Sequence, residues 1–313
     1  MLPRIRRGLL VGIALLHAGC GEETDGSITG IVGRRPLEGP ISFTIRDMYA
    51  PLKGSTGVGE PRVGISMRTE KDYPCSNYEI QATVRRSSSE ARFRLYDVGL
   101  GPICLTSLGP ATRADFLDWT PGRYALVIQN NDGSDVYDVA VTDSTILIVP
   151  QAGGFTSATD DTVWRVPRSS MAIRCDTPVG ADSLCDQLVA AVLEAVPLRE
   201  FWFPAAGLAP YGRTTVFYGT QITVRCFRYD EADAFERAVA AATTWLATRP
   251  PDSVARISIS LANWNNARAF PGTAPIDGRE RKAARREPSG PRWYAREDSN
   301  LRHPAPEAGA LSS

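Results

Sequence analysis

The stretch Leu117-Asp-Trp-Thr-Pro-Gly-Arg-Tyr-Ala-Leu-Val-Ile128 decides how the first half of the chain is interpreted. A Pro-Gly turn opens it, and Tyr124, Leu126 and Ile128 then alternate with smaller or different residues. Such period-two alternation is typical of a strand with one buried face. The pattern recurs in five more runs, at 41–45, 78–84, 91–96, 137–141 and 146–149. Short strands separated by turns, with little helical periodicity, predict a two-sheet β-sandwich over residues 31–150.

The same stretch resembles the turn-Pro-Gly-x-Tyr-x-Leu-x-Ile segment of immunoglobulin-like and fibronectin-like sandwiches. In those folds a tyrosine near the start of a late strand bonds back to the backbone and forms a corner. The resemblance therefore implies an immunoglobulin-like sandwich with Tyr124 at the corner. It implies nothing about a ligand.

Beyond residue 150 the periodicity changes. Residues 151–162 are rich in Gly, Ser and Thr and predict a linker. From 163 to 270, strand-like runs alternate with two apolar helical faces, and Asp230 is a candidate N-cap for the second helix. The order strand-helix-strand-strand-helix-strand predicts a small α+β domain of the ferredoxin-like, split βαβ type.

The first twenty residues have the layout of an export signal. Three arginines within the first seven residues precede an apolar run at 8–16, and two small residues lead into Cys20. A cysteine at the cleavage point resembles the lipobox of bacterial lipoproteins, although His17 stands where that family usually has Leu. The resemblance implies a lipid on Cys20 and a tether at 21–30. The protein would then be anchored to a membrane of the bacterial cell envelope, the outer membrane if the cell is Gram-negative.

Composition limits the classes of partner. The 313 residues are 43% hydrophobic and 22% charged, which suits a globular protein of about two domains. Lys+Arg and Asp+Glu both number 35, so no general attraction to nucleic acid is expected, and none is predicted as a partner. After the export signal, no segment approaches the ~18 apolar residues that a membrane-spanning helix needs.

Cysteine and histidine usage restricts the chemistry further. The chain has six cysteines, and an oxidising compartment favours their pairing. Cys75 and Cys104 flank two predicted strands and are expected to form one disulfide. Cys175 and Cys226 are expected to form another, with Cys185 either unpaired or an alternative partner. There is no CxxC motif and no histidine nearby, so we expect neither a metal site nor a cofactor.

Histidine is almost absent, since His17 lies in the export signal and His303 in the tail. This excludes Ser-His-Asp and Cys-His catalysis from the expected mature fold, and we predict no catalytic residues. A non-catalytic binding or structural role is the favoured hypothesis. The alternatives are a secreted hydrolase that uses carboxylates to act on glycan, and a peptidase-inhibitor-like module. The adjacent acids Asp160 and Asp161 do not supply the separation that such a hydrolase needs.

Aromatic residues supply the candidate binding positions. The densest group lies between 201 and 218, and one further tryptophan follows the last predicted strand. The candidate contacts to a glycan or an envelope protein are Trp202, Tyr211, Tyr218 and Trp264. The alternative for each is a place in a buried core. At 129–135, Asp-Gly between two strong strands predicts a hairpin turn in preference to a calcium loop.

Residues 271–313 resemble neither half of the chain. They are polar and Pro-rich, with a basic run at 278–286, and they predict a disordered tail. The segment 293–312 resembles the peptide obtained when a tRNA gene is translated. That resemblance implies that the reading frame runs past its natural end, so no function is assigned beyond about residue 277.

Overall fold

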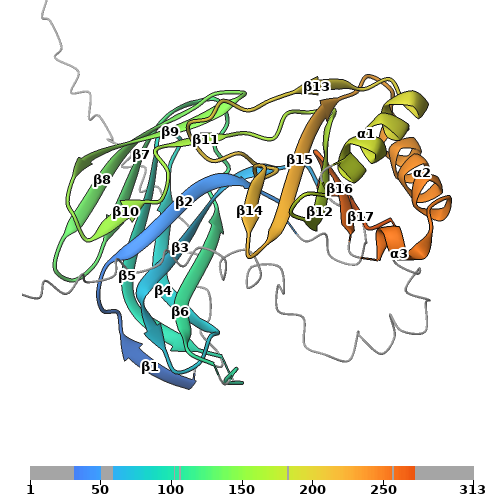
Figure 1. Ribbon diagram of the computed structural model, residues 1–313. Helices are drawn as coiled ribbons and strands as arrows, with labels where there is room; N and C mark the ends of the chain where they lie inside the picture. The colour runs from blue at the N-terminus through green and yellow to red at the C-terminus, as the bar shows by residue number, and fades with distance from the viewer. Residues whose placement is uncertain are drawn as a thin grey trace, which may run out of the picture.

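A computed structural model of the chain describes residues 32–50, 59–101, 103–105, 107–181, 183–255 and 257–271. The predicted export signal with Cys20, the tether and nearly all of the tail lie outside the described residues. Two β-sheets lie side by side, and the helices cover the smaller sheet on the side away from the larger one (Figure 1). Among the described residues, no helix is both long enough and apolar enough to cross a membrane.

The larger sheet has eleven strands. Their path is β10-β2-β3-β6-β4-β5-β7-β8-β9-β11, and β1 also pairs with β5. The pairs β10–β2, β4–β6 and β5–β7 are parallel and the others are antiparallel, so the sheet is mixed. The strands are β1 (Val32–Pro36), β2 (Ile41–Met48), β3 (Arg62–Tyr73), β4 (Tyr78–Arg86), β5 (Glu90–Leu100), β6 (Gly109–Phe116), β7 (Gly122–Gln129), β8 (Ser134–Val141), β9 (Thr145–Ala152), β10 (Thr156–Ala158) and β11 (Thr162–Trp164).

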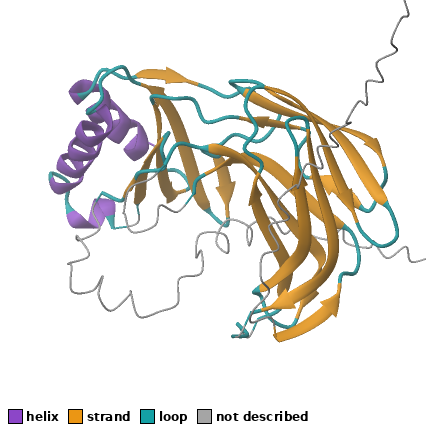
Figure 2. Ribbon diagram, turned by 180° about the vertical axis from the view of Figure 1, so that it is seen from behind, coloured by secondary structure: helices purple, strands orange, loops and turns teal. Residues whose placement is uncertain are grey.

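This sheet curls until its two ends face each other (Figure 2). Strand β2 lies near one end and β8 near the other, yet Phe43 and Tyr137 pack edge to face with ring centroids 4.9 Å apart. Alternate residues of each strand, such as Ile41 and Ile45, point into the enclosed core and are almost completely buried. The prediction of a β-rich first half is therefore confirmed, and its strands follow one continuous sheet.

The prediction of a linker at 151–162 is wrong. Strand β9 extends to Ala152, and β10 pairs with β2 and β11 with β9, so this segment completes the large sheet. Asp135 fixes the chain between them, because its carboxylate accepts hydrogen bonds from Gly154 N (2.7 Å) and Thr156 N (2.6 Å). Glycine is needed at position 153 because the backbone passes very close to Asp135: a Cβ there would lie 1.7 Å from Asp135 Oδ1.

The smaller sheet has six strands in the path β13-β15-β12-β16-β17, with β14 also pairing with β15. Every neighbouring pair in it is antiparallel. Helices α1 and α2 pack together on one face, against alternate residues of β12 such as Met171 and Ile173. The elements are β12 (Ser170–Pro178), α1 (Ser183–Ala195), β13 (Arg199–Phe201), β14 (Thr215–Phe217), β15 (Thr220–Arg228), α2 (Ala234–Ala247), α3 (Pro251–Val254), β16 (Ser258–Asn263) and β17 (Arg268–Ala269).

Helix α2 begins later than predicted. Its N-cap is Asp233 and not Asp230, whose carboxylate instead pairs with the Arg199 guanidinium at 2.9 Å. The rest of the predicted order, with a strand, a helix, two or more strands, a helix and a strand, is present in the structure.

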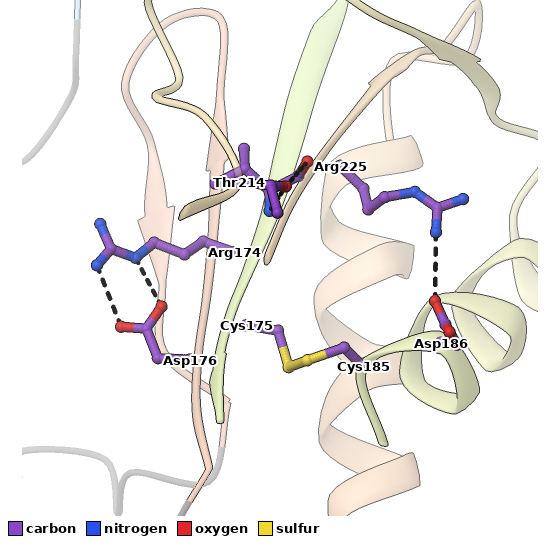
Figure 3. Close-up of a disulfide and its surroundings, with 8 residues drawn as sticks. Arg174, Cys175, Asp176, Cys185, Asp186, Thr214 and Arg225 are labelled. Carbon is purple, nitrogen blue, oxygen red and sulfur yellow. Dashed lines mark hydrogen bonds and ion pairs between the residues drawn. A yellow bond between two sulfur atoms is a disulfide. The ribbon is translucent and has the colours of Figure 1, made fainter. Parts of the chain in front are cut away.

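Two disulfides are present, and one of them corrects the expected pairing. Cys75 pairs with Cys104 as predicted, but Cys175 pairs with Cys185, which leaves Cys226 as the free thiol (Figure 3). The reason is strand register: Cys175 lies opposite Thr223, and Cys226 opposite Ala172. Successive side chains of a strand point to opposite faces, so Cys175 faces the helices and Cys226 faces away from them. Cys185, at the start of α1, lies on the face that Cys175 occupies.

A buried ion pair fixes the chain where it leaves the larger sheet. The Asp47 side chain is 1% exposed, and its Oδ1 accepts hydrogen bonds from Arg165 Nε (3.1 Å) and Nη2 (2.9 Å). Its Oδ2 accepts the backbone N–H of Val166 at 2.8 Å. Because Asp47 belongs to β2 and Arg165 follows β11, the contact fixes the chain where it passes from one sheet to the other.

Candidate functional site

The β14–β15 hairpin carries a strained aromatic residue at its tip. Phe217 pairs with Thr220, so only Tyr218 and Gly219 form the turn, and their φ angles are +45° and +76°. Two positive φ angles define a type I′ turn, whose first position favours Asn, Asp or Gly. A bulky residue there is an outlier, and such strain is often kept where it serves a function.

The side chains around this turn are apolar and exposed. Tyr218 is 92% exposed and its ring packs edge to face on Phe217, with centroids 4.4 Å apart. Val216 and Val179 are also more than half exposed, and Val179 N donates to Gly219 O at 3.1 Å. We call Val179, Val216, Phe217 and Tyr218 the hairpin patch. Its four residues are exposed and lie at the end of three strands, β12, β14 and β15.

The hairpin patch lies on an open edge of the smaller sheet. Strands β13 and β14 both pair with the same side of β15, at its two ends. Between β13 and β14, β15 is hydrogen-bonded by a side chain. The Thr214 hydroxyl accepts the N–H of Val224 at 3.1 Å and donates to the Val224 carbonyl at 3.4 Å (Figure 3). No charged residue occurs from 214 to 224, although edge strands are usually protected by charge.

Trp202 lies on the same edge as the hairpin patch. It follows β13 directly and is 75% exposed. The register of β13 and β14 along β15 places it roughly 20 Å from Tyr218, at about 3.3 Å per residue. Two of the four predicted aromatic contacts, Trp202 and Tyr218, therefore lie on one exposed edge.

The other two, Tyr211 and Trp264, lie at the junction between the sheets. The Tyr211 hydroxyl is 2.8 Å from Ser170 Oγ and donates to Ser170 O at 3.2 Å. Tyr49, just after β2, donates to Trp264 O at 2.8 Å. Burial raises the pKa of Tyr211 far above its ordinary range, so the hydroxyl stays protonated as a donor. Both residues contribute to the junction between the two sheets, and neither lies on the exposed edge.

The free thiol belongs to this junction and not to a reactive site. Cys226 is buried, and its pKa is raised from 9.0 to about 12, first by burial and then by the negative charge of Glu200. A thiol reacts as its thiolate, so Cys226 is inert at neutral pH.

The segment 129–135 forms the predicted hairpin turn. Asn130 N donates to Gly133 O at 3.0 Å, and Asn130 Oδ1 accepts the N–H groups of Asp132 (2.9 Å) and Gly133 (2.8 Å). A hollow of about 260 Å³ lies beside the turn and contains Asp132 and Asp135. The Asp135 carboxylate already accepts hydrogen bonds from the backbone N–H groups of Gly154 and Thr156 and from the Thr156 hydroxyl. Within the described ranges, no three side chains of the metal-binding types gather at one point.

Asp160 and Asp161 lie between β10 and β11. Burial raises the pKa of Asp160, and the charge of Asp161 raises it further. A glycan hydrolase would need carboxylates from separate segments on the two sides of a cleft. The hollow beside the turn at 129–135 is lined by acids of that one turn, Asp132 and Asp135, and not by acids of two separate segments.

The sequence analysis missed Val179 and Val216. The uncharged run from 214 to 224, which is unusual for a sheet edge, would have pointed to Val216, whereas no local signal marks Val179.

Comparison with known proteins adds no relative to this description. No protein-family model matches the chain, and neither a curated protein nor a solved structure does so.

Proposed function

We propose that the chain is an exported, lipid-anchored protein of the bacterial cell envelope with a non-catalytic binding role, and that the hairpin patch is its binding surface. The occupant we propose is an envelope protein that adds an extended segment beside β14. An uncharged edge with unpaired backbone groups is suited to strand addition, and the flanking aromatic side chains supply anchors.

Export is supported by the disulfides. Two disulfides in one chain are characteristic of an oxidising compartment outside the cytoplasm. The lipid anchor rests on the arginines, the apolar run and Cys20 in the first twenty residues.

The conformation of Tyr218 carries the proposal for the binding surface. Among the described residues, the other non-glycine positions with positive φ are Asp118, Ser169 and Asn266, whose short polar side chains tolerate that region better. Tyr218 gains no burial in return for its strain, because its side chain is 92% exposed. A partner that covers the Tyr218 ring would supply the burial that the free chain lacks and would offset the strain.

We further propose that the two sheets are variants of an immunoglobulin-like sandwich and a ferredoxin-like domain. For the first, the Tyr124 hydroxyl donates to Thr120 O at 2.9 Å and the Tyr124 ring stacks on Trp119 at 4.5 Å, which is the bond expected of a tyrosine corner. For the second, the strand order β13-β15-β12-β16 is that of a split βαβ unit with antiparallel neighbours.

Site-specific photocrosslinking in cells tests the binding surface. A photoreactive phenylalanine at position 218 or 216 is expected to give an adduct with one envelope protein. The same residue at Leu147, which is exposed on β9, is the control and is expected to give none. Adducts of equal yield at Leu147, or none at 216 and 218, would refute the proposed surface.

Metabolic labelling with a clickable palmitate analogue tests the anchor separately. The full chain is expected to take up label, and the Cys20→Ser variant to lose it. Label retained by the variant would show that Cys20 is not the lipidated residue.

A further inference from the structure

The connection between β5 and β6 exposes three aliphatic side chains. Ile103, Leu105 and Leu108 are 56%, 55% and 75% exposed, and we call these three residues the aliphatic loop. The sequence from 98 to 112 contains no charged residue. Single apolar residues scattered over a surface are ordinary, whereas three so close together in an uncharged segment indicate a surface that contacts something.

The backbone of the aliphatic loop is held against the turn between β3 and β4. Cys104 forms a disulfide with Cys75, which is buried. The Asn77 side chain bonds to the backbone on both sides of this disulfide. Its Nδ2 donates to Ile103 O at 2.7 Å, and its Oδ1 accepts the N–H of Leu105 at 3.0 Å. These contacts fix the backbone of the loop, and with it the exposure of the aliphatic side chains.

The aliphatic loop lies beside the point where the N-terminal segment enters the fold. Val32 of β1 pairs with Leu100, the last residue of β5, and the loop follows directly. β1 and these strand ends lie at one end of the larger sheet, away from the helices (Figure 1). Val32 is 12 residues after Cys20, and a chain of that length spans at most roughly 40 Å. A lipid on Cys20 would therefore keep this end of the sheet close to the membrane.

We propose that the aliphatic loop inserts into the surface of the lipid bilayer that holds the chain. The inference rests on the proposed lipid anchor, which supplies both the membrane and the orientation. Aliphatic side chains on an uncharged loop are stabilised by burial among acyl chains, in proportion to the apolar area buried. Insertion adds a second attachment beside the lipid and fixes the angle between the larger sheet and the bilayer.

The composition of the loop favours a bilayer over a protein partner. The residues that dominate protein interfaces are mainly Trp, Tyr and Arg, and leucine is under-represented among them. Residues 98–112 contain none of those three types. The hairpin patch differs in this respect, because it includes the aromatic residues Phe217 and Tyr218.

Photocrosslinking in cells grown with radioactive phosphate tests the proposal. A photoreactive phenylalanine replaces Leu108 in the full chain, and the radioactivity that stays on the chain after irradiation and solvent extraction is measured. We expect labelled phospholipid to be attached at position 108. Leu193, an exposed leucine of α1 on the smaller sheet, is the matched control. No radioactivity above that of an unirradiated sample is expected there.

A charge within the loop separates insertion from proximity alone. With the photoreactive residue at Leu105, Leu108→Asp is expected to lower the lipid adduct by about tenfold, because the burial of one leucine is lost and a carboxylate would have to be buried instead. Leu193→Asp makes the same change on α1 and is expected to leave the adduct at 105 unchanged. Thermal melting checks folding, and Leu108→Asp is expected to melt like the unaltered chain because Leu108 is 75% exposed.

The outcomes distinguish insertion of the loop from the anchor itself. Palmitate label without a lipid adduct at 108 would overturn insertion and leave the anchor standing. A lipid adduct at 108 without palmitate label would support insertion and refute the anchor, and absence of both would overturn both. An adduct at 108 with a protein in place of lipid, or equal lipid adducts at 108 and 193, would also overturn insertion.

Discussion

Replacing Tyr218 by asparagine is expected to make the protein more stable while abolishing its proposed binding. At a φ of +45° a residue with a side chain is strained by roughly 1–2 kcal/mol, and asparagine is among the residues that best tolerate this region. The loss of burial is negligible because Tyr218 is 92% exposed. The lost edge-to-face contact with Phe217 offsets the gain by about 0.5 kcal/mol.

The net expectation is a gain of about 0.5–1 kcal/mol. For a folded region of this size, that corresponds to a rise in melting temperature of roughly 1–4 °C. Differential scanning calorimetry measures it. Tyr218→Phe is the matched control, since it keeps the ring and the backbone strain and is expected to melt like the unaltered chain.

A second control isolates the turn. A Cβ at Gly219 would meet no atom within 4 Å, so Gly219→Ala introduces strain at a φ of +76° without a steric clash. It is expected to destabilise by about 1 kcal/mol. If Tyr218→Asn lowers the melting temperature, or if Gly219→Ala leaves it unchanged, the turn is not strained in the way argued and the functional inference loses its basis.

Three further predictions concern an ion pair, a free thiol and a disulfide. Asp47→Ala is expected to cost about 3–5 kcal/mol in unfolding free energy, because it leaves Arg165 without its buried partner; chemical denaturation measures this, and a loss below about 1 kcal/mol would contradict it. Cys226 is expected to react with a thiol reagent only after unfolding. The stability of the fold is expected to decrease as pH rises from about 9 towards 12, because the pKa of this thiol is higher in the folded chain and the unfolded chain therefore loses the proton first. A Cys226→Ala variant is expected to show a smaller decrease over the same pH range. Replacing both Cys75 and Cys104 by serine is expected to cost about 3–4 kcal/mol, from the loop of 29 residues that the disulfide closes, and an unchanged denaturation midpoint would argue against that loop-entropy account.

The sequence was most informative where apolar residues alternate without interruption. Runs such as 41–45 and 124–128 predicted β2 and β7 because each has one buried face. Strand β3 shows the same alternation at Val63, Ile65 and Met67. Its second half could not be predicted, because the residues at 70–72 are polar and exposed and break the pattern. Strand β6 begins Gly-Pro and has little intrinsic strand preference, so only its neighbours explain it.

The sequence was least informative about relations between distant segments. Cysteine spacing left the partner of Cys175 open, because pairing depends on which face of a strand each side chain occupies. The same holds for the aromatic residues: nothing local distinguishes Tyr211, which docks the sheets, from Tyr218, which is exposed. Arg85 and Arg92 likewise lie opposite each other only because of the register of the β4–β5 pair.

The contact between Asp47 and Arg165 has a consequence for the order in which the chain acquires structure. These residues are 118 positions apart, and β10 joins β2 across a similar separation. During synthesis, β2 is complete long before its last partners exist, and one of its edges stays open until residues 156–166 emerge. Closure of the larger sheet is therefore a late and slow event, as expected for a topology rich in distant contacts. A nascent chain interrupted near residue 150 would present an unpaired strand to its neighbours and would be prone to aggregate.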